Sequence, residues 1–229
     1  RILLGRRIAK SMKMILMIAI PSAAGMTVLA KPIVNILFPT SPDGWDLLMI
    51  GARTLILISV VSIQTAILQG IGKTYIPTIH MVLGLVLKLF INYNLVSIRA
   101  VNIKGAVAGS AACYLFAFFT NYRSIKKLTG VRLNVKKLFN RPLSVSIIMG
   151  VLVLFVYKGF ELITGWFVDS VLLQSLICGG IAMVTGVAAY YLLMIAVKGI
   201  TADDIRNLPG GKRILAFTLK LPYIDRFLS

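Results

Sequence analysis

Residues 79–94 read IHMVLGLVLKLFINYN, an apolar run that is interrupted by one lysine, and they indicate a helix inside a membrane. The run belongs to a stretch from Tyr75 to Ile98 that is long enough, because a helix needs ~20 residues to cross a bilayer core. An open strand is excluded in lipid, since its edge would leave backbone groups without hydrogen-bond partners. The stretch therefore predicts a transmembrane helix, and its lysine needs a separate explanation.

Five other stretches of the chain have a similar length and composition. Of the 229 residues, 58% are hydrophobic and only 14% are charged, whereas about a quarter of a typical soluble domain is charged. We predict an all-α, polytopic membrane protein embedded in a lipid bilayer. Its six transmembrane helices are expected at residues 14–38, 45–70, 75–98, 105–122, 143–163 and 168–197.

The net charge of +18 follows the predicted topology. Nineteen of the 25 Lys and Arg residues lie before residue 14, at residue 73, between residues 123 and 141, or after residue 197, which all fall on one side of the membrane. The joins on the other side hold only Arg99 and Lys104. Cytoplasmic segments are enriched in Lys and Arg, so we expect both ends of this chain to be cytoplasmic. The same distribution argues against nucleic acid as a partner.

Lys88 is one of four cations that topology does not explain. It shares one side of its helix with His80, Gly84 and Asn92, because these residues are spaced by four. It lies near the middle of the bilayer, where a charge costs ~2.5–3.5 kcal/mol unless it meets water, a partner or an anion. We interpret His80, Lys88 and Asn92 as candidate lining of a cavity that attracts an anionic substrate. Alternatively, neighbouring carbonyls and Asn92 satisfy the lysine inside the bundle.

The first two predicted helices carry further candidates. Arg53 and Gln64 lie inside the second helix, and we expect them to contribute to the same substrate cavity; hydrogen bonding between helices is the alternative. Pro21 and Gly25 lie inside the first helix and are candidates for a hinge. A static kink explains them equally well.

The sequence lacks the residue patterns that metal binding, catalysis and ion coupling usually need. Cys113 and Cys178 lie inside apolar runs, and the chain has a single histidine, so we expect no metal site and no cofactor. No phosphate-binding loop, nucleophile–base arrangement or paired catalytic carboxylates can be found, so we expect that the protein is not an enzyme. No acidic residue lies in the middle of a predicted span, where ion-coupled sites usually hold one.

Four stretches in order resemble a known family. They are residues 20–38 (IPSAAGMTVLAKPIVNILF), 68–77 (LQGIGKTYIP), 88–95 (KLFINYNL) and 102–114 (NIKGAVAGSAACY). Together they resemble the second half of the bacterial stage V sporulation protein B group. That group belongs to the polysaccharide-export and lipid II flippase branch of the multidrug/oligosaccharidyl-lipid/polysaccharide exporter superfamily.

The resemblance implies the C-terminal portion of a fourteen-helix exporter of the bacterial plasma membrane. Residues 1–128 would be the last four helices of its second bundle, and residues 142–198 an extra helix pair. Residues 129–141 would form a basic cytoplasmic loop, and residues 199–229 a basic cytoplasmic tail with an interfacial helix. The first bundle would be missing from this chain and would be its partner. The family's cargo-contacting charges lie largely in the missing helices. The choice of Lys88 and Arg53 as candidates therefore depends only on their depth in the membrane and their position around the helix.

The implied function is alternating-access flipping of a lipid-linked anionic sugar, commonly a polyprenyl diphosphate, for cell-wall, spore-cortex or polysaccharide synthesis. Three alternatives stay open from the sequence. One is a drug/cation antiporter of the same superfamily, which would need an essential carboxylate outside this chain. The second is a membrane-embedded glycosyl- or acyltransferase, for which catalytic residues are lacking. The third is a non-transporting scaffold of wall synthesis.

Overall fold

The computed structural model describes residues 2–40, 42–98, 103–131, 135–167, 170–197 and 199. These residues form helices and contain no strand. In chain order the elements are α1 (Ile2–Val28), α2 (Ala30–Leu37), the 3₁₀ turn η1 (Pro42–Gly44), α3 (Trp45–Gly70), α4 (Tyr75–Val96), α5 (Ile103–Thr129), α6 (Val135–Thr164) and α7 (Val171–Ala196). Six of the helices are long and apolar enough to cross a membrane, which confirms the all-α, polytopic prediction.

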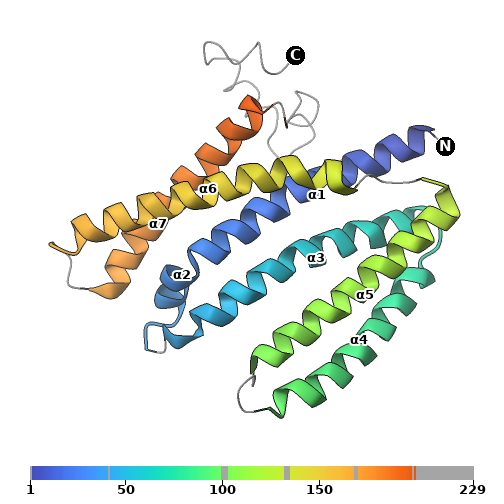
Figure 1. The fold of residues 1–229 in the computed structure, drawn as a ribbon, viewed down its shortest axis with the longest axis horizontal. Coiled ribbons are helices and arrows are strands. Elements are labelled where there is room, and N and C mark those ends of the chain that lie inside the picture. The colour runs from blue at the N-terminus through green and yellow to red at the C-terminus, as the bar shows by residue number, and fades with distance from the viewer. Residues whose placement is uncertain are drawn as a thin grey trace.

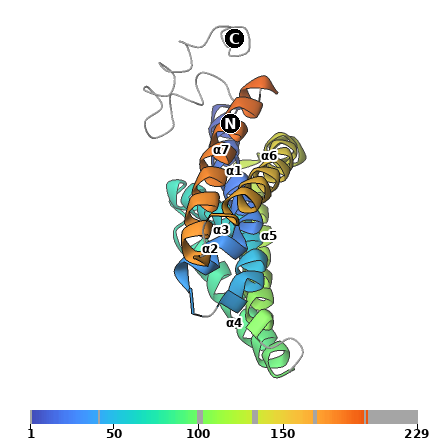
Figure 2. The same cartoon turned by 90° about the vertical axis from the view of Figure 1, so that its left-hand side faces the viewer.

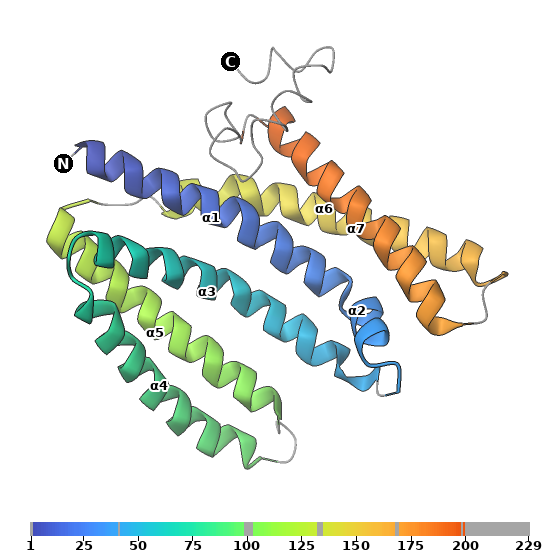
Figure 3. The ribbon, with the colours of Figure 1, turned by 180° about the vertical axis from the view of Figure 1, so that it is seen from behind.

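The long helices form a thin slab rather than a round bundle (Figures 1 and 2). Helix α1 packs against α3, α3 packs against α5, and α5 packs against α4 at the edge. On the other side of α1 lie α6 and α7, which pack against each other. Seen from behind, α1 and α7 lie in front of α6 (Figure 3). Much of the apolar surface of the slab is therefore left uncovered by protein.

The first span differs from the single helix predicted for residues 14–38. The helix begins at Ile2, well before the predicted start at residue 14. Ile8, Met12 and Leu16 form a buried stripe on one side of it, and this packing stabilises the helix ahead of the apolar run. It stops at Val28, and α2 begins at Ala30 after a turn at Leu29. Pro32 explains the break, because it has no N–H for the Val28 carbonyl and its ring obstructs a continuous helix.

The basic loop predicted for residues 129–141 is mostly helix. Helix α5 continues to Thr129 and α6 begins at Val135, so the join is only residues 130–134. Gly130 has a φ of 71°, and its N–H donates to the Lys126 carbonyl, which is how a left-handed glycine ends a helix. The tail predicted for residues 199–229 falls outside the described residues except at Gly199.

Glycines bring α4 and α5 into close contact. A Cβ added to Gly84 would lie 3.0 Å from Cys113 Sγ, and one added to Gly105 would lie 2.8 Å from Leu95 Cβ. A Cβ on Gly109 would overlap Asn92 Oδ1. Gly105 and Gly109 therefore form a small-residue face through which α5 contacts α4.

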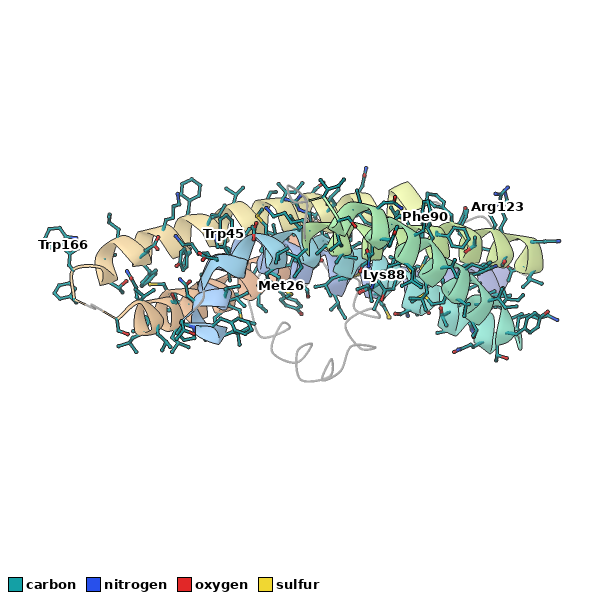
Figure 4. All side chains as sticks on the ribbon, turned by 90° about the horizontal axis from the view of Figure 1, so that it is seen from below. Met26, Trp45, Lys88, Phe90, Arg123 and Trp166 are labelled. Carbon is teal, nitrogen blue, oxygen red and sulfur yellow. The ribbon has the colours of Figure 1, made fainter. Side chains whose placement is uncertain are left out.

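Charge divides the slab into two ends. We call the end that holds the start of α1, the α3–α4 turn and the α5–α6 join the cationic end. The exposed cations there include Arg6, Arg7, Lys126 and Lys127. Figure 4 places Arg123 near this end and Trp166 at the opposite one. At the opposite end, Lys104 pairs with Asp46 at 2.7 Å and joins the first turns of α5 and α3.

Substitution of Gly109 tests the α4–α5 contact. We expect Gly109→Ala to destabilise the protein by about 1–3 kcal/mol, because the added methyl group overpacks against Asn92. Gly159→Ala is the matched control, since no atom lies within 4 Å of its added Cβ and alanine favours a helix there by about 0.5–1 kcal/mol. Thermal unfolding of the purified protein in detergent measures both. Equal stability of the two variants would contradict the contact.

Candidate functional site

The stripe on α4 faces α5. His80 Nδ1 donates a hydrogen bond to Asn121 Oδ1 of α5 at 2.8 Å. Gly84 and Asn92 lie against Cys113 and Gly109 of the same helix. The spacing of four therefore identified a common side of α4, and the described contacts show that this side meets a neighbouring helix.

Lys88 lies within this α4–α5 contact, and part of its side chain remains exposed. Its backbone carbonyl oxygen lies 3.4 Å from the position that a Cβ on Gly109 would take. The side chain is only half-buried, and no described residue forms a hydrogen bond or an ion pair with it. It is thirteen residues into α4, which places it ~20 Å along the helix from the cationic end. Figure 4 shows it between Arg123 and Trp166.

Gln64 is the most deeply buried candidate. Its side chain is 0% exposed, and neither its Nε2 nor its Oε1 has a hydrogen-bond partner. Asn121 is 1% exposed and its Nδ2 has no partner either. The Asp46–Lys104 ion pair sets the register of α3 and α5. By that register Gln64 is level with Asn121, and with its partner His80, about 8–12 Å from the cationic ends of their helices.

Arg53 lies elsewhere. Its exposed side chain lines a groove of about 300 Å³ between α1, α3 and α6, together with Ser146, whose buried hydroxyl has no partner. None of His80, Lys88 or Gln64 lines this groove. The structure therefore places Arg53 apart from the α4 stripe and does not join the candidates in one cavity.

An apolar slot lies between α1 and α7, and α6 forms its floor. Its volume is about 510 Å³, within the roughly 300–1,000 Å³ of ligand pockets. The slot is lined by Met14, Met17, Ile18, Pro21, Ser22, Gly25, Met26, Leu29 and Ile33 on the α1–α2 side, by Met149 and Val153 of α6, and by Met183, Gly186, Val187, Tyr190 and Tyr191 of α7. Five of the nine methionines line it, and their flexible side chains adapt to irregular apolar ligands.

The slot opens sideways. Ile18, Met183 and Val187 on its rim are 49%, 64% and 65% exposed. Two polar side chains of its lining are already engaged: Ser22 Oγ donates to the Ile18 carbonyl at 2.7 Å, and Tyr190 Oη donates to the Met17 carbonyl at 2.8 Å. The slot therefore offers an aliphatic surface to a ligand that enters from the bilayer.

The two hinge candidates both line this slot. Helix α1 continues through Pro21 without a break. Gly25 has no atom within 4 Å of the position that its Cβ would take, so open space lies beside it. The interruption of the span lies further along, at Leu29. Whether Pro21 and Gly25 act as a hinge stays a prediction.

Sequence reasoning missed the slot. The side of α1 that lines it is readable, since Met14, Met17, Pro21 and Gly25 are three or four residues apart. Nothing in the sequence places α7 across this side. The Tyr190–Met17 hydrogen bond joins residues 173 positions apart. The sequence feature that could have indicated this hydrogen bond is Pro21, because proline leaves the Met17 carbonyl without a donor from its own helix.

The fold and the slot define a polytopic α-helical membrane protein with a lateral apolar cavity. The chain is 29% identical over 217 residues to the lipid II flippase MurJ of Bacillus subtilis (strain 168), and the alignment covers 91% of the chain. The chain spans 38% of that relative's length. This similarity supports the resemblance to the exporter superfamily. No protein-family model and no solved structure matches the chain.

Gln64 gives a stability test of the buried polar groups. We expect Gln64→Leu to raise the thermal unfolding temperature in detergent, because it removes a buried amide whose unmet hydrogen bonds cost about 1–3 kcal/mol. Asn121→Leu should lower it, since His80 then loses its partner. A lower unfolding temperature for Gln64→Leu would show that the amide has a partner, such as an internal water.

Proposed function

We propose that this chain is part of a transporter that flips a lipid-linked anionic oligosaccharide, such as a polyprenyl diphosphate sugar, across the bacterial plasma membrane. The apolar slot carries the proposal. Its methionine-rich lining and its engaged hydroxyls suit an aliphatic chain. Its rim is exposed at the side of the helices, which is where the chain of a membrane lipid would enter. The similarity to a relative named as a lipid II flippase supports a lipid-linked cargo.

Lys88 is proposed to attract the diphosphate of the cargo. It is a half-buried cation at mid-helix depth, with no hydrogen-bond or ion-pair partner among the described residues. A phosphate oxygen would give it the charged partner that its position in a bilayer demands. His80, Asn92 and Gln64 are proposed to support this region from inside the α4–α5 and α3–α5 contacts, and Arg53 to add positive potential from its separate groove.

The slot and Lys88 lie at different edges of the slab. The row from α1 through α3 and α5 to α4 contains three helix contacts. At 8–10 Å for each contact, α1 and α4 are separated by up to about 24–30 Å. One cargo molecule can engage both regions together only if its lipid chain is long, which a polyprenyl chain is. A cargo with a short chain would meet them one after the other.

Transport itself would need a second bundle. Alternating access arises when two bundles rock around a site between them. We propose that residues 1–128 belong to one such bundle, that residues 142–198 form an extra helix pair, and that the other bundle belongs to the same protein. The cationic end is proposed to be cytoplasmic. Cell-wall, spore-cortex and polysaccharide synthesis are the processes that such a cargo would serve.

Removal of the Lys88 charge tests its role. In the full-length protein, we expect Lys88→Met to weaken binding of a polyprenyl diphosphate about tenfold or more, because a hydrogen bond to a charged group contributes about 1.5–3 kcal/mol. Expression should stay normal. Lys158→Met is the control, since Lys158 is exposed near the opposite end. Undiminished complementation of a flippase-deficient strain by Lys88→Met would rule out this role.

Filling the slot tests the lipid-chain site. We expect Gly25→Leu to reduce flipping strongly, because its Cβ would meet no atom within 4 Å and the rest of the side chain would occupy the slot. Gly25→Ala should have a small effect, since one methyl group fills little of the cavity. A vesicle assay of lipid-linked sugar translocation compares the two. Equal losses in both variants would instead indicate that flexibility at Gly25 matters.

A further inference from the structure

Pro21 leaves one backbone carbonyl of α1 without its helix donor. In a continuous helix the N–H of residue 21 would bond to the carbonyl of Met17, four residues earlier, and proline has no N–H. Met17 is only 6% exposed. A buried carbonyl inside a membrane has no water to turn to, so this one needs a donor from another part of the protein.

Tyr190 of α7 is that donor. Its hydroxyl donates to the Met17 carbonyl at 2.8 Å. Around this bond, Met17 packs with Val145 of α6 and Met194 of α7 in a small buried cluster, against which Tyr190 also packs. Both Tyr190 and Met17 line the slot, toward the end of α7 that lies at the cationic end.

The other end of the slot is held differently. There α2 packs against α7. Asn35 Nδ2 donates to Ser175 Oγ at 3.5 Å, and Pro32 lies against Gly179. Between these two ends lies the open stretch of the slot, where a Cβ added to Gly25 would meet no atom within 4 Å. One end is thus closed by a packed helix, and the other by a small buried cluster that contains the Tyr190–Met17 hydrogen bond.

We propose that Tyr190 is a latch that closes the slot at the cationic end by supplying the donor that Pro21 lacks. One side-chain hydrogen bond is broken far more readily than a helix contact, so this end is where the slot opens. When the bond breaks, α7 moves away from α1 and the Met17 carbonyl becomes accessible to water or to a polar ligand group. The latch stands on this bond and on the slot, whether or not the slot holds a cargo lipid.

Hydrogen exchange on the full-length protein in detergent tests the latch. In Tyr190→Phe we expect amide exchange to rise about two- to tenfold in residues 17–28 and 183–196, as befits the loss of one hydrogen bond. Tyr93→Phe is the control, because this substitution also removes a tyrosine hydroxyl but does so far from the slot. Tyr93 lies on α4 and is 80% exposed. It should leave exchange in both segments unchanged.

Pro21→Ala makes the test specific. Alanine supplies the missing N–H, so Tyr190→Phe should have little effect on exchange when it is combined with Pro21→Ala. An unchanged exchange rate in Tyr190→Phe alone would overturn the proposal, and so would an equally large increase in the double variant. If Tyr190→Phe fails to fold, Pro21→Ala alone decides: slower exchange in residues 17–28 supports the latch, and unchanged exchange contradicts it. None of these results depends on transport, so they leave the proposed function to its own tests.

Discussion

Every backbone carbonyl within a bilayer must find a donor inside the protein, and the form of this molecule follows from that constraint. It explains why the described residues are helical, and why a proline has different consequences at different positions. Pro77 lies in the first turn of α4, where no donor is lost. Pro32 ends α1, and Pro21 sends the Met17 carbonyl to Tyr190. The contact that closes one end of the slot is thus a consequence of one missing N–H.

The sequence predicted the spans well and their ends poorly, for a physical reason. Hydropathy reports where a helix meets lipid, so all six spans were found. It does not report helix beyond the lipid. The basic residues between Ile2 and residue 14, and those after Val135, are helical because the helices continue toward the cationic end, where Ile8 and Met12 still pack. The break at Leu29 was missed because the apolar run passes through it, although Pro32 signalled it.

The helix phase of the candidate residues could be predicted from the sequence, and their neighbours could not. Spacing of four correctly placed His80 and Asn92 on one side of α4 with Lys88, but spacing cannot tell whether a side meets a cavity or a helix. The glycine face of α5 that receives this side was readable as packing. The slot was not, because it arises where α7 crosses α1, and contacts between distant segments leave no local pattern. Its methionines and Tyr190 come together only where these two helices cross.

The proposed flippase role depends most on the slot holding the lipid chain of the cargo. Photocrosslinking in bilayers measures this directly, using the full-length protein and a polyprenyl diphosphate that carries a photoreactive group in its chain. We expect adducts in residues 14–29 of α1 and its following turn and in residues 183–191 of α7, which line the slot. Adducts confined to the exposed side of α4, where Val86, Leu89 and Phe90 face outward, would contradict it.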